Sequence, residues 1–273
     1  MTMSTEVKDP TPPAADTSRI GLPRRLDTDQ PLSSRKLNVG CGFNHAPGYV
    51  NIDLQDFHAP EVVADVRDLH MLPSRSFDEV QSRDVIEHFE WRDTPRALYE
   101  WNRLLVDGGR LFVSTTYLTG LLRRLTDNTY STVRLHKLLI VNLFSMQKYT
   151  GDYHYTAFTE RLIRFYLWET GFEIESIEVL DGWLFHIWAK KIKDYSCADL
   201  IADSQSDEHF IASMYRTLLG RDPDAASAEI KLQSLVSRST NRAQVAKQFL
   251  NCEEREEIMM SACPDFGLSF DTA

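Results

Sequence analysis

The sequence has no long apolar run and a shortage of positive charge. Its longest apolar stretch, Leu138 to Phe144, is broken by Asn142, whereas a membrane-spanning helix needs about 20 apolar residues. Lys and Arg number 30 against 40 Asp and Glu, which gives a net charge of -10. Nucleic-acid binding depends on clustered Lys and Arg. We therefore expect no membrane span and no nucleic-acid partner.

Cysteines are also few, and none of the four, Cys41, Cys197, Cys252 and Cys263, forms a C-x-x-C pair. This pattern indicates neither a zinc ribbon nor a disulfide framework. It suits a reducing cytoplasm. The N-terminal residues contain no apolar signal core, so export is not expected. The predicted localisation is cytoplasmic.

The chain of 273 residues divides into five regions. Residues 1–34 are interrupted by prolines and are expected to be a disordered leader. Residues 35–193 alternate short apolar runs with helical patterns, which is typical of a parallel α/β sheet. Residues 194–206 read as a linker. A small all-α domain is predicted over 207–260, followed by a tail over 261–273.

Within the α/β region the pattern predicts five strands, a closing hairpin and two helices. The strands are Lys36–Val39, Tyr49–Ile52, Val62–Ala64, Phe77–Gln81 and Gly109–Ser114, and the hairpin pairs Phe172–Val179 with Trp183–Lys190 around Asp181-Gly182. One helix is expected near Arg92–Leu105, ended by Asp107-Gly108-Gly109, and another over Glu160–Thr170.

Residues 117–157 are longer than a normal connection. Their residue pattern predicts helix and is partly apolar. Two interpretations stay open: an extra packing helix, or a lid over a substrate pocket.

Polar and glycine residues follow the first three predicted strands. Gly40-Cys41-Gly42 ends the first strand, where absent side chains let a ligand approach the backbone. Asp53 ends the second, where a carboxylate can accept hydrogen bonds from ribose hydroxyls. Asp65 and Val66 follow the third, where they could contact the edge of an adenine.

Several segments in this order resemble the class I methyltransferases, especially the bacterial type-11 group. They are LNVGCG at 37–42, NIDL at 51–54, ADVRDLHMLPSRSFDEV at 64–80, DVIEHF at 84–89, EWNRLLVDGGRLFVST at 100–115 and HYTAFTERLIRFYLWETGFEI at 154–174. The resemblance implies a Rossmann-like, seven-stranded sheet flanked by helices that binds S-adenosylmethionine (SAM).

Carried over by position, the resemblance implies a set of cofactor-binding residues. They are Gly40, Cys41, Gly42, Asp53, Leu54, Asp65, Val66, Ser82 and Arg83. Two departures stand out. The acidic residue usual before the first glycine is Asn38 here, and only about eleven residues separate Gly42 from Asp53, so the usual first helix must be shortened or lost.

A nicotinamide dinucleotide is the alternative cofactor. It favours G-x-G-x-x-G leading into a full helix that holds its pyrophosphate. Here Phe43-Asn44-His45 follows Gly42, so the third glycine is missing. SAM has no phosphate and does not need that glycine or the helix.

Methyl transfer to a hydroxyl also requires removal of a proton. His154, just before the Glu160–Thr170 helix, is the candidate catalytic base. Asp84, Glu87 and His88 share one face if they lie on a helix, and with His154 they could bind a divalent metal. Both versions, a plain base and a metal site, are carried forward.

The segment Met214 to Asp224 resembles domain of unknown function 4214, a small helical module akin to phycobilisome linkers that occurs in bacterial secreted and surface-polysaccharide proteins. The resemblance implies an interaction role, with a protein as the expected partner.

The leading interpretation of the whole chain is a SAM-dependent O-methyltransferase acting on a small molecule or a sugar or glycan precursor in polysaccharide biosynthesis. The alternative is a non-catalytic scaffold that docks through its helical domain.

Overall fold

The computed structural model describes residues 34–204 and 206–268. All of the predicted leader except Ser34 lies outside the described residues, as do residues 269–273 of the predicted tail. Within the described part, no helix combines the length and the apolar content needed to cross a bilayer.

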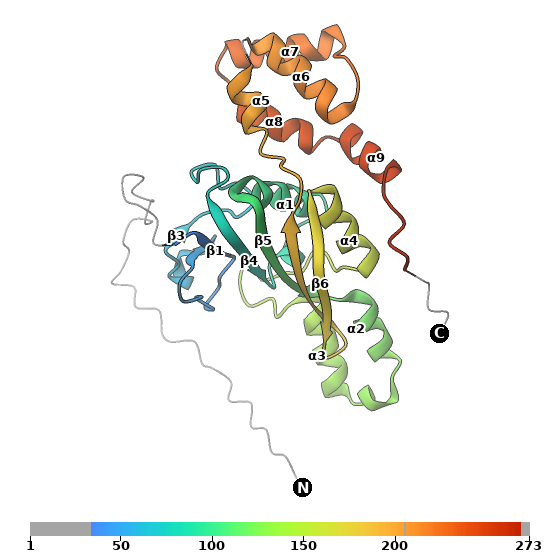
Figure 1. The fold of residues 1–273 in the computed structure, drawn as a ribbon. Coiled ribbons are helices and arrows are strands. Elements are labelled where there is room, and N and C mark those ends of the chain that lie inside the picture. The colour runs from blue at the N-terminus through green and yellow to red at the C-terminus, as the bar shows by residue number, and fades with distance from the viewer. Residues whose placement is uncertain (1–33, 205, 269–273) are drawn as a thin grey trace.

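One seven-stranded sheet forms the centre of the molecule (Figure 1). Its spatial order is β3-β2-β1-β4-β5-β7-β6, with β1 to β5 parallel and β7 antiparallel to both of its neighbours. This confirms the predicted Rossmann-like sheet. The strands are β1 (Lys36–Val39), β2 (Val50–Asp53), β3 (Val62–Val63), β4 (Phe77–Arg83), β5 (Leu105–Thr116), β6 (Phe172–Leu180) and β7 (Leu184–Lys191).

The main core lies between one face of this sheet and two helices, α1 (Asp93–Leu104) and α4 (Glu160–Glu169). Alternate residues of β1 and β5, such as Val39 and Val113, point to this face and are fully buried. The helices contribute Trp101 and Leu167, which are equally buried. α4 begins at the N-cap Thr159, whose side chain accepts a hydrogen bond from the backbone N–H of Leu162.

The connections that follow β1, β2 and β4 contain at most short 3-10 helices before the next element. Between β1 and β2 there is a loop with no helix, which confirms the predicted loss of the first helix. Between β2 and β3 there is only the 3-10 helix η1 (Asp56–His58). A second 3-10 helix, η2 (Ile86–His88), follows β4.

The first long helix was predicted within one residue at each end, but the role of Asp107-Gly108-Gly109 as its terminator was wrong. α1 ends at Leu104 and β5 begins at the next residue, so Asp107-Gly108-Gly109 lies inside a strand. Gly108 has a φ of +74°, and the pairing of β4 with β5 shifts register between Phe77 and Glu79. The glycines therefore accommodate an irregularity in the sheet.

The long connection contains two helices, α2 (Leu118–Leu125) and α3 (Val133–Phe144), with the 3-10 helix η3 (Asn128–Tyr130) between them. They project together beyond the end of the sheet at which β5 ends (Figure 1). α2 packs against the β6–β7 turn, where Asp181 and Gly182 both adopt the positive φ of a tight hairpin.

The C-terminal module surrounds a second apolar cluster, which also includes Tyr99 of α1. It contains α5 (Ala198–Asp203), α6 (Asp207–Met214), the π-helix η4 (Tyr215–Leu219), α7 (Ala225–Val236), α8 (Arg242–Leu250) and α9 (Glu253–Ser261). The predicted apolar pairs Phe210 with Met214 and Val245 with Phe249 lie in this core. The structure does not support an open linker over 194–206, because α5 lies within it and Tyr195 is buried in the same core.

Ion pairs fix the module against the sheet domain. Lys247 of α8 places its Nζ 2.6 Å from Asp68 and 3.1 Å from the almost fully buried carboxylate of Glu100 on α1. Arg75 pairs with Asp194 at 2.6 Å and with Asp199 at 2.9 Å. The independence of the two domains stays a prediction.

The contact of α2 with the hairpin turn gives a test of the fold. A Cβ added at Gly120 would lie 1.9 Å from the carbonyl oxygen of Gly182. Gly120→Ala is therefore expected to lower the free energy of unfolding by about 1–3 kcal/mol, the usual cost of overpacking. Urea unfolding measures it, with the neighbouring Thr119→Ala as control. Equal stabilities of the two variants would contradict the contact.

Candidate active site

A buried polar network replaces the missing helix between β1 and β2. The Asn38 side-chain amide donates to Asn51 Oδ1 at 2.8 Å and to the backbone carbonyl of Asn44 at 3.0 Å. Asn51 Oδ1 also accepts from the backbone N–H of Ala46 at 2.8 Å, and Glu61 accepts from the backbone N–H of Asn51 at 2.6 Å. An aspartate at position 38 could not donate these bonds. The unusual Asn38 is thus explained by the loop it holds.

Asp53 ties the tips of β1 and β2 together. Its Oδ2 accepts from the backbone N–H of Gly42 at 2.8 Å, and its Oδ1 accepts from the N–H of Gln55 at 2.8 Å and from Nδ1 of His58 at 2.9 Å. The residue is only 7% exposed. No sequence motif singles out His58. The structure makes it the partner of the predicted ribose-binding carboxylate.

The glycine loop leaves open space at the strand tip. Gly40 has a φ of +66°, and a Cβ there would lie 2.5 Å from Val85, so this position requires glycine. A Cβ at Gly42 would meet nothing within 4 Å. Cys41 is buried, and burial raises the pKa of its thiol to about 12, so it is not a reactive thiolate. Leu54, another predicted cofactor-binding residue, is 58% exposed.

The remaining predicted cofactor-binding residues differ in their burial and in the contacts that their side chains already make within the protein. Burial would raise the pKa of Asp65, but hydrogen bonds from Arg67 outweigh it and lower the pKa. Val66 is buried in the core. Ser82 is fully buried and its hydroxyl has no hydrogen-bond partner among the described residues. Arg83 is exposed, and its guanidinium stacks on Phe112 at 4.3 Å.

His154 and His88 lie next to each other. Their rings meet edge to face with centroids 4.6 Å apart. Nδ1 of His154 lies 3.1 Å from the carbonyl oxygen of Asn142, and Nδ1 of His88 lies 3.0 Å from that of Tyr153. Because a carbonyl only accepts, each Nδ1 carries the proton and each Nε2 keeps its lone pair. Burial, and then His88, lower the pKa of His154 to about 4.

The metal site predicted from Asp84, Glu87, His88 and His154 is not assembled. In the described part of the chain, no three His, Cys, Asp or Glu residues are grouped so that they could hold an ion. The segment is not a continuous helix, since Asp84 has a φ of +54° and η2 begins only at Ile86. Asp84 instead accepts from the Ser114 hydroxyl at 3.2 Å.

Glu87 is a structural residue at the base of the insertion. It is 1% exposed, and its carboxyl group accepts from the Thr115 hydroxyl at 2.9 Å. Burial, reinforced by Asp84, raises its pKa to about 8. Its backbone carbonyl accepts from the N–H groups of Tyr155 and Thr156 at 2.8 and 3.1 Å, which positions the segment that carries His154.

The end of the insertion reaches the tip of β2. The ring of Tyr149 packs edge to face on Phe57 with centroids 5.3 Å apart, and Phe43 packs in the same way on His58 at 4.6 Å. The side chain of Gln55 donates to the backbone carbonyl of Thr150 at 3.3 Å. Phe43 and Phe57 are 77% and 55% exposed. Of the two interpretations of residues 117–157, these contacts favour the lid.

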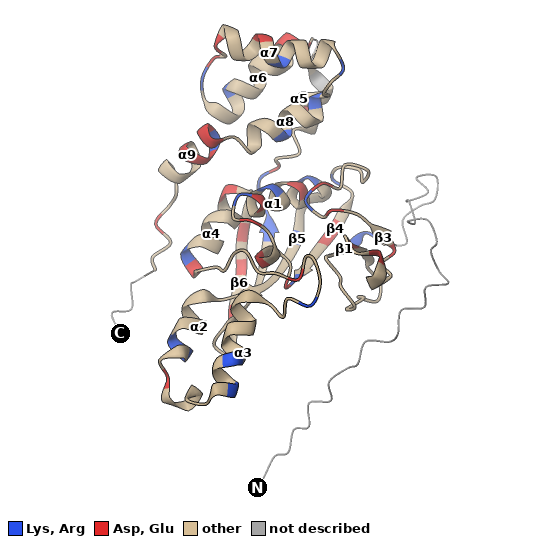
Figure 2. Cartoon of the chain, turned by 180° about the vertical axis from the view of Figure 1, so that it is seen from behind, with Lys and Arg blue, Asp and Glu red and all other residues tan. Residues whose placement is uncertain are grey.

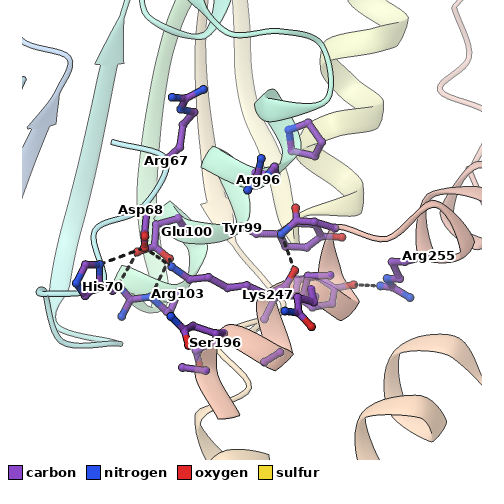
Figure 3. A pocket seen from close by; sticks show the side chains of 18 of the residues that line it. Arg67, Asp68, His70, Arg96, Tyr99, Glu100, Arg103, Ser196, Lys247 and Arg255 are labelled. Carbon is purple, nitrogen blue, oxygen red and sulfur yellow. Dashed lines mark hydrogen bonds and ion pairs between the residues drawn. The ribbon is translucent and has the colours of Figure 1, made fainter. Parts of the chain in front are cut away.

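A large cavity of about 1000 Å³ lies elsewhere, between α1 and the C-terminal module (Figure 3). Its walls include Tyr99, Arg103, Lys247 and Arg255. None of the predicted cofactor-binding, catalytic or metal-binding residues lines it. The candidate active site is therefore at the strand tips, where the glycine loop, Asp53 and the histidine pair belong to neighbouring segments.

Comparison with known proteins identifies two domain matches in this chain. Residues 41–113, from the glycine loop through β5, match the family model of a methyltransferase domain. The chain contains a methyltransferase domain. Such a domain takes its methyl group from SAM. Residues 198–259 match DUF4214, a domain of unknown function, and this match begins inside the predicted linker.

Among solved structures, similar chains include SAM-dependent methyltransferases. One from Methanosarcina mazei is 20% identical, with 58% of this chain and 92% of that chain covered and a TM-score of 0.43. One from Mesorhizobium loti is 19% identical, with coverages of 59% and 93% and a TM-score of 0.40. A comparison with curated proteins gave no match.

The buried Glu87 of the methyltransferase gives a test by pH. A carboxyl group whose folded pKa lies near 8 holds a proton that the unfolded chain releases above pH 4.5. Wild-type stability therefore falls between these values by about 1.4 kcal/mol per pH unit from this group. Glu87→Gln removes that loss.

Urea unfolding at pH 5.5 and pH 7.5 measures it. The stability of Glu87→Gln relative to wild type should rise by about 2 kcal/mol across this range. The exposed Glu90→Gln serves as control and should show no such change. A pH-independent difference for Glu87→Gln would mean that the buried carboxyl is ionised.

Proposed function

We propose that this methyltransferase transfers a methyl group from SAM to a hydroxyl oxygen of a small molecule, with a sugar or glycan precursor as the acceptor class. The observation that carries the proposal is the 2.8 Å bond between the Gly42 N–H and Asp53 at adjoining strand tips. It joins the glycine loop to Asp53, the carboxylate that we assign to the ribose, within the segment that matches a methyltransferase domain.

The residues present fit SAM. Gly42 leaves room for a ligand beside the backbone, and Leu54 offers an exposed apolar side chain to adenine. A carboxylate has about four acceptor positions, and three protein bonds to Asp53 leave one for a ribose hydroxyl. When bound, SAM supplies an electrophilic methyl group for an in-line displacement, and the protein mainly aligns the two reactants.

His154 is the proposed base for the acceptor hydroxyl. With its Nδ1 proton held by the carbonyl of Asn142, its Nε2 is the atom that can take a proton. The edge contact with His88 fixes the ring further. The low pKa keeps the imidazole neutral at physiological pH, so it is always in the form that accepts a proton.

The alternative interpretation, a non-catalytic scaffold, was favoured by Asn38 and by the missing helix, and the structure gives Asn38 another explanation. Asn38 holds the β1–β2 loop by donating two hydrogen bonds, so its presence reflects that loop rather than decay of a site. A glycan acceptor is supported only by the occurrence of DUF4214-like modules in bacterial surface-polysaccharide proteins.

The ribose assignment predicts the effect of a change at Asp53. Asp53→Asn should weaken binding of SAM and S-adenosylhomocysteine by about 1.5–3 kcal/mol, because charge-assisted hydrogen bonds are lost. Calorimetric titration measures it, with the neighbouring exposed Asp56→Asn as control. Wild-type affinity in a folded Asp53→Asn protein would remove the assignment. Since this variant also alters the His58 contact, Leu54→Asp provides a second, surface variant that should weaken binding without unfolding.

The base assignment predicts a pH profile. Transfer of a labelled methyl group from SAM to an accepted hydroxyl should be flat in kcat between pH 6 and pH 8 and should fall only near the His154 pKa of about 4. His154→Ala should lower kcat by about 10²-fold or more and leave SAM affinity nearly unchanged, whereas the exposed His70→Ala should have no effect. Near-normal turnover in His154→Ala would return this histidine to a structural role.

A further inference from the structure

The α2–α3 hairpin, residues 118–148, differs in charge from the rest of the protein. It holds five basic side chains, Arg123, Arg124, Arg134, Lys137 and Lys148, against the single acidic residue Asp127. Its net charge is thus positive, while the whole chain carries -10. Figure 2 shows the basic residues on both helices of the hairpin and acidic residues concentrated elsewhere.

The outer face of α3 is also apolar. Val133, Ile140 and Phe144 follow one another at spacings of seven and four residues, which places them on one side of a helix. They are 76%, 47% and 48% exposed. Lys137 lies in the same row, between Val133 and Ile140. Further exposed apolar side chains of the hairpin are Leu122, Leu138 and Met146.

Two basic residues of α3, Arg134 and Lys137, lie beside and within this apolar row. Among the residues that the structure describes, neither Arg134 nor Lys137 has an ion-pair partner, and α3 itself contains no acidic residue. Exposed apolar area with interspersed cations is costly in water unless a partner covers it. A partner that combines negative charge with an apolar interior fits this surface, and that is the chemistry of an anionic lipid bilayer.

We propose that the α2–α3 hairpin is a docking surface for an anionic membrane, with α3 lying in the interface and Val133, Ile140 and Phe144 entering the boundary between headgroups and acyl chains. Arg134 and Lys137 then lie at the level of the anionic headgroups. The binding is additive in charge and apolar area, so it weakens with salt and with the loss of either component.

The position of the hairpin gives this docking a consequence. The hairpin and the C-terminal module lie at opposite ends of the sheet (Figure 1), so the module does not stand between the hairpin and a membrane. The chain runs directly from α3 into the segment that carries Tyr149 and His154. Docking therefore brings the strand tips close to the membrane surface, where a lipid-linked acceptor would be presented. This last step rests on the proposed function; the docking itself does not.

Other occupants fit less well. A second copy of the hairpin would bring positive charge against positive charge. Residues 1–33 carry five acidic and four basic side chains, which gives them almost no net charge to complement the surface. Nucleic acid would pair with the cations but would leave the apolar row exposed.

The test is flotation of the full chain with vesicles. Vesicles of phosphatidylcholine with 30% phosphatidylglycerol are compared with pure phosphatidylcholine at low and at physiological salt. We expect binding to the anionic vesicles to be at least tenfold stronger than to the neutral ones and to weaken with salt. Equal binding to both compositions, or no binding to either, would overturn the proposal.

Two pairs of substitutions separate the contributions of charge and of apolar side chains to vesicle binding. Arg134→Glu with Lys137→Glu should lower vesicle binding at least tenfold, and Ile140→Gln with Phe144→Gln should lower it even at low salt. Arg216→Glu with Arg238→Glu, on the C-terminal module, makes the same change in charge and should bind like wild type. Circular dichroism and S-adenosylhomocysteine binding report whether each variant is folded.

The remaining outcomes assign the surface to another occupant and overturn the proposal. If the hairpin variants change the oligomeric state in light scattering without changing vesicle binding, the face is an interface between copies. Vesicle binding that appears only after removal of residues 1–33 would mean that this segment occupies the hairpin. Vesicle binding does not require methyl transfer, so its failure is distinct from failure of the proposed function.

Discussion

The proposed active site depends on how β1 is joined to β2 without a helix. Parallel strands usually need a crossover of a dozen or more residues, and here a short loop makes the connection. Its polar groups are satisfied by a buried network centred on Asn38, Asn51 and Asp53. The network has two effects at once. It holds the loop, and it fixes the Asp53 carboxylate against the Gly42 N–H where the cofactor is proposed to bind.

The insertion after β5 completes the site from the other side. Its last residues bond to the backbone of Glu87, bring His154 against His88 and place Tyr149 over Phe57. The same insertion forms the basic and apolar α2–α3 hairpin. A single segment thus connects the proposed base, the aromatic cover of the strand tips and the proposed membrane surface, while the C-terminal module is held at the far end by Lys247 and Arg75.

The sequence predicted the sheet well because apolar strand runs and tip residues are local signals. It also predicted the lost helix, from the short distance between Gly42 and Asp53. It failed where tertiary contacts decide. Nothing in the amino-acid sequence shows that Asp107-Gly108-Gly109 is accommodated within a strand, or that the side chain of His58 reaches Asp53. The metal site failed because the spacing of Asp84, Glu87 and His88 implied a helix that a residue with positive φ prevents.

The most direct test of the account is a crystal structure of the full chain with S-adenosylhomocysteine. The ligand is expected at the tips of β1 and β2, with the ribose at Asp53 and the adenine against Leu54. The interdomain cavity is the competing location, since it is large and lined by charged side chains. Ligand bound in that cavity, with the strand tips empty, would contradict the assignment of the active site.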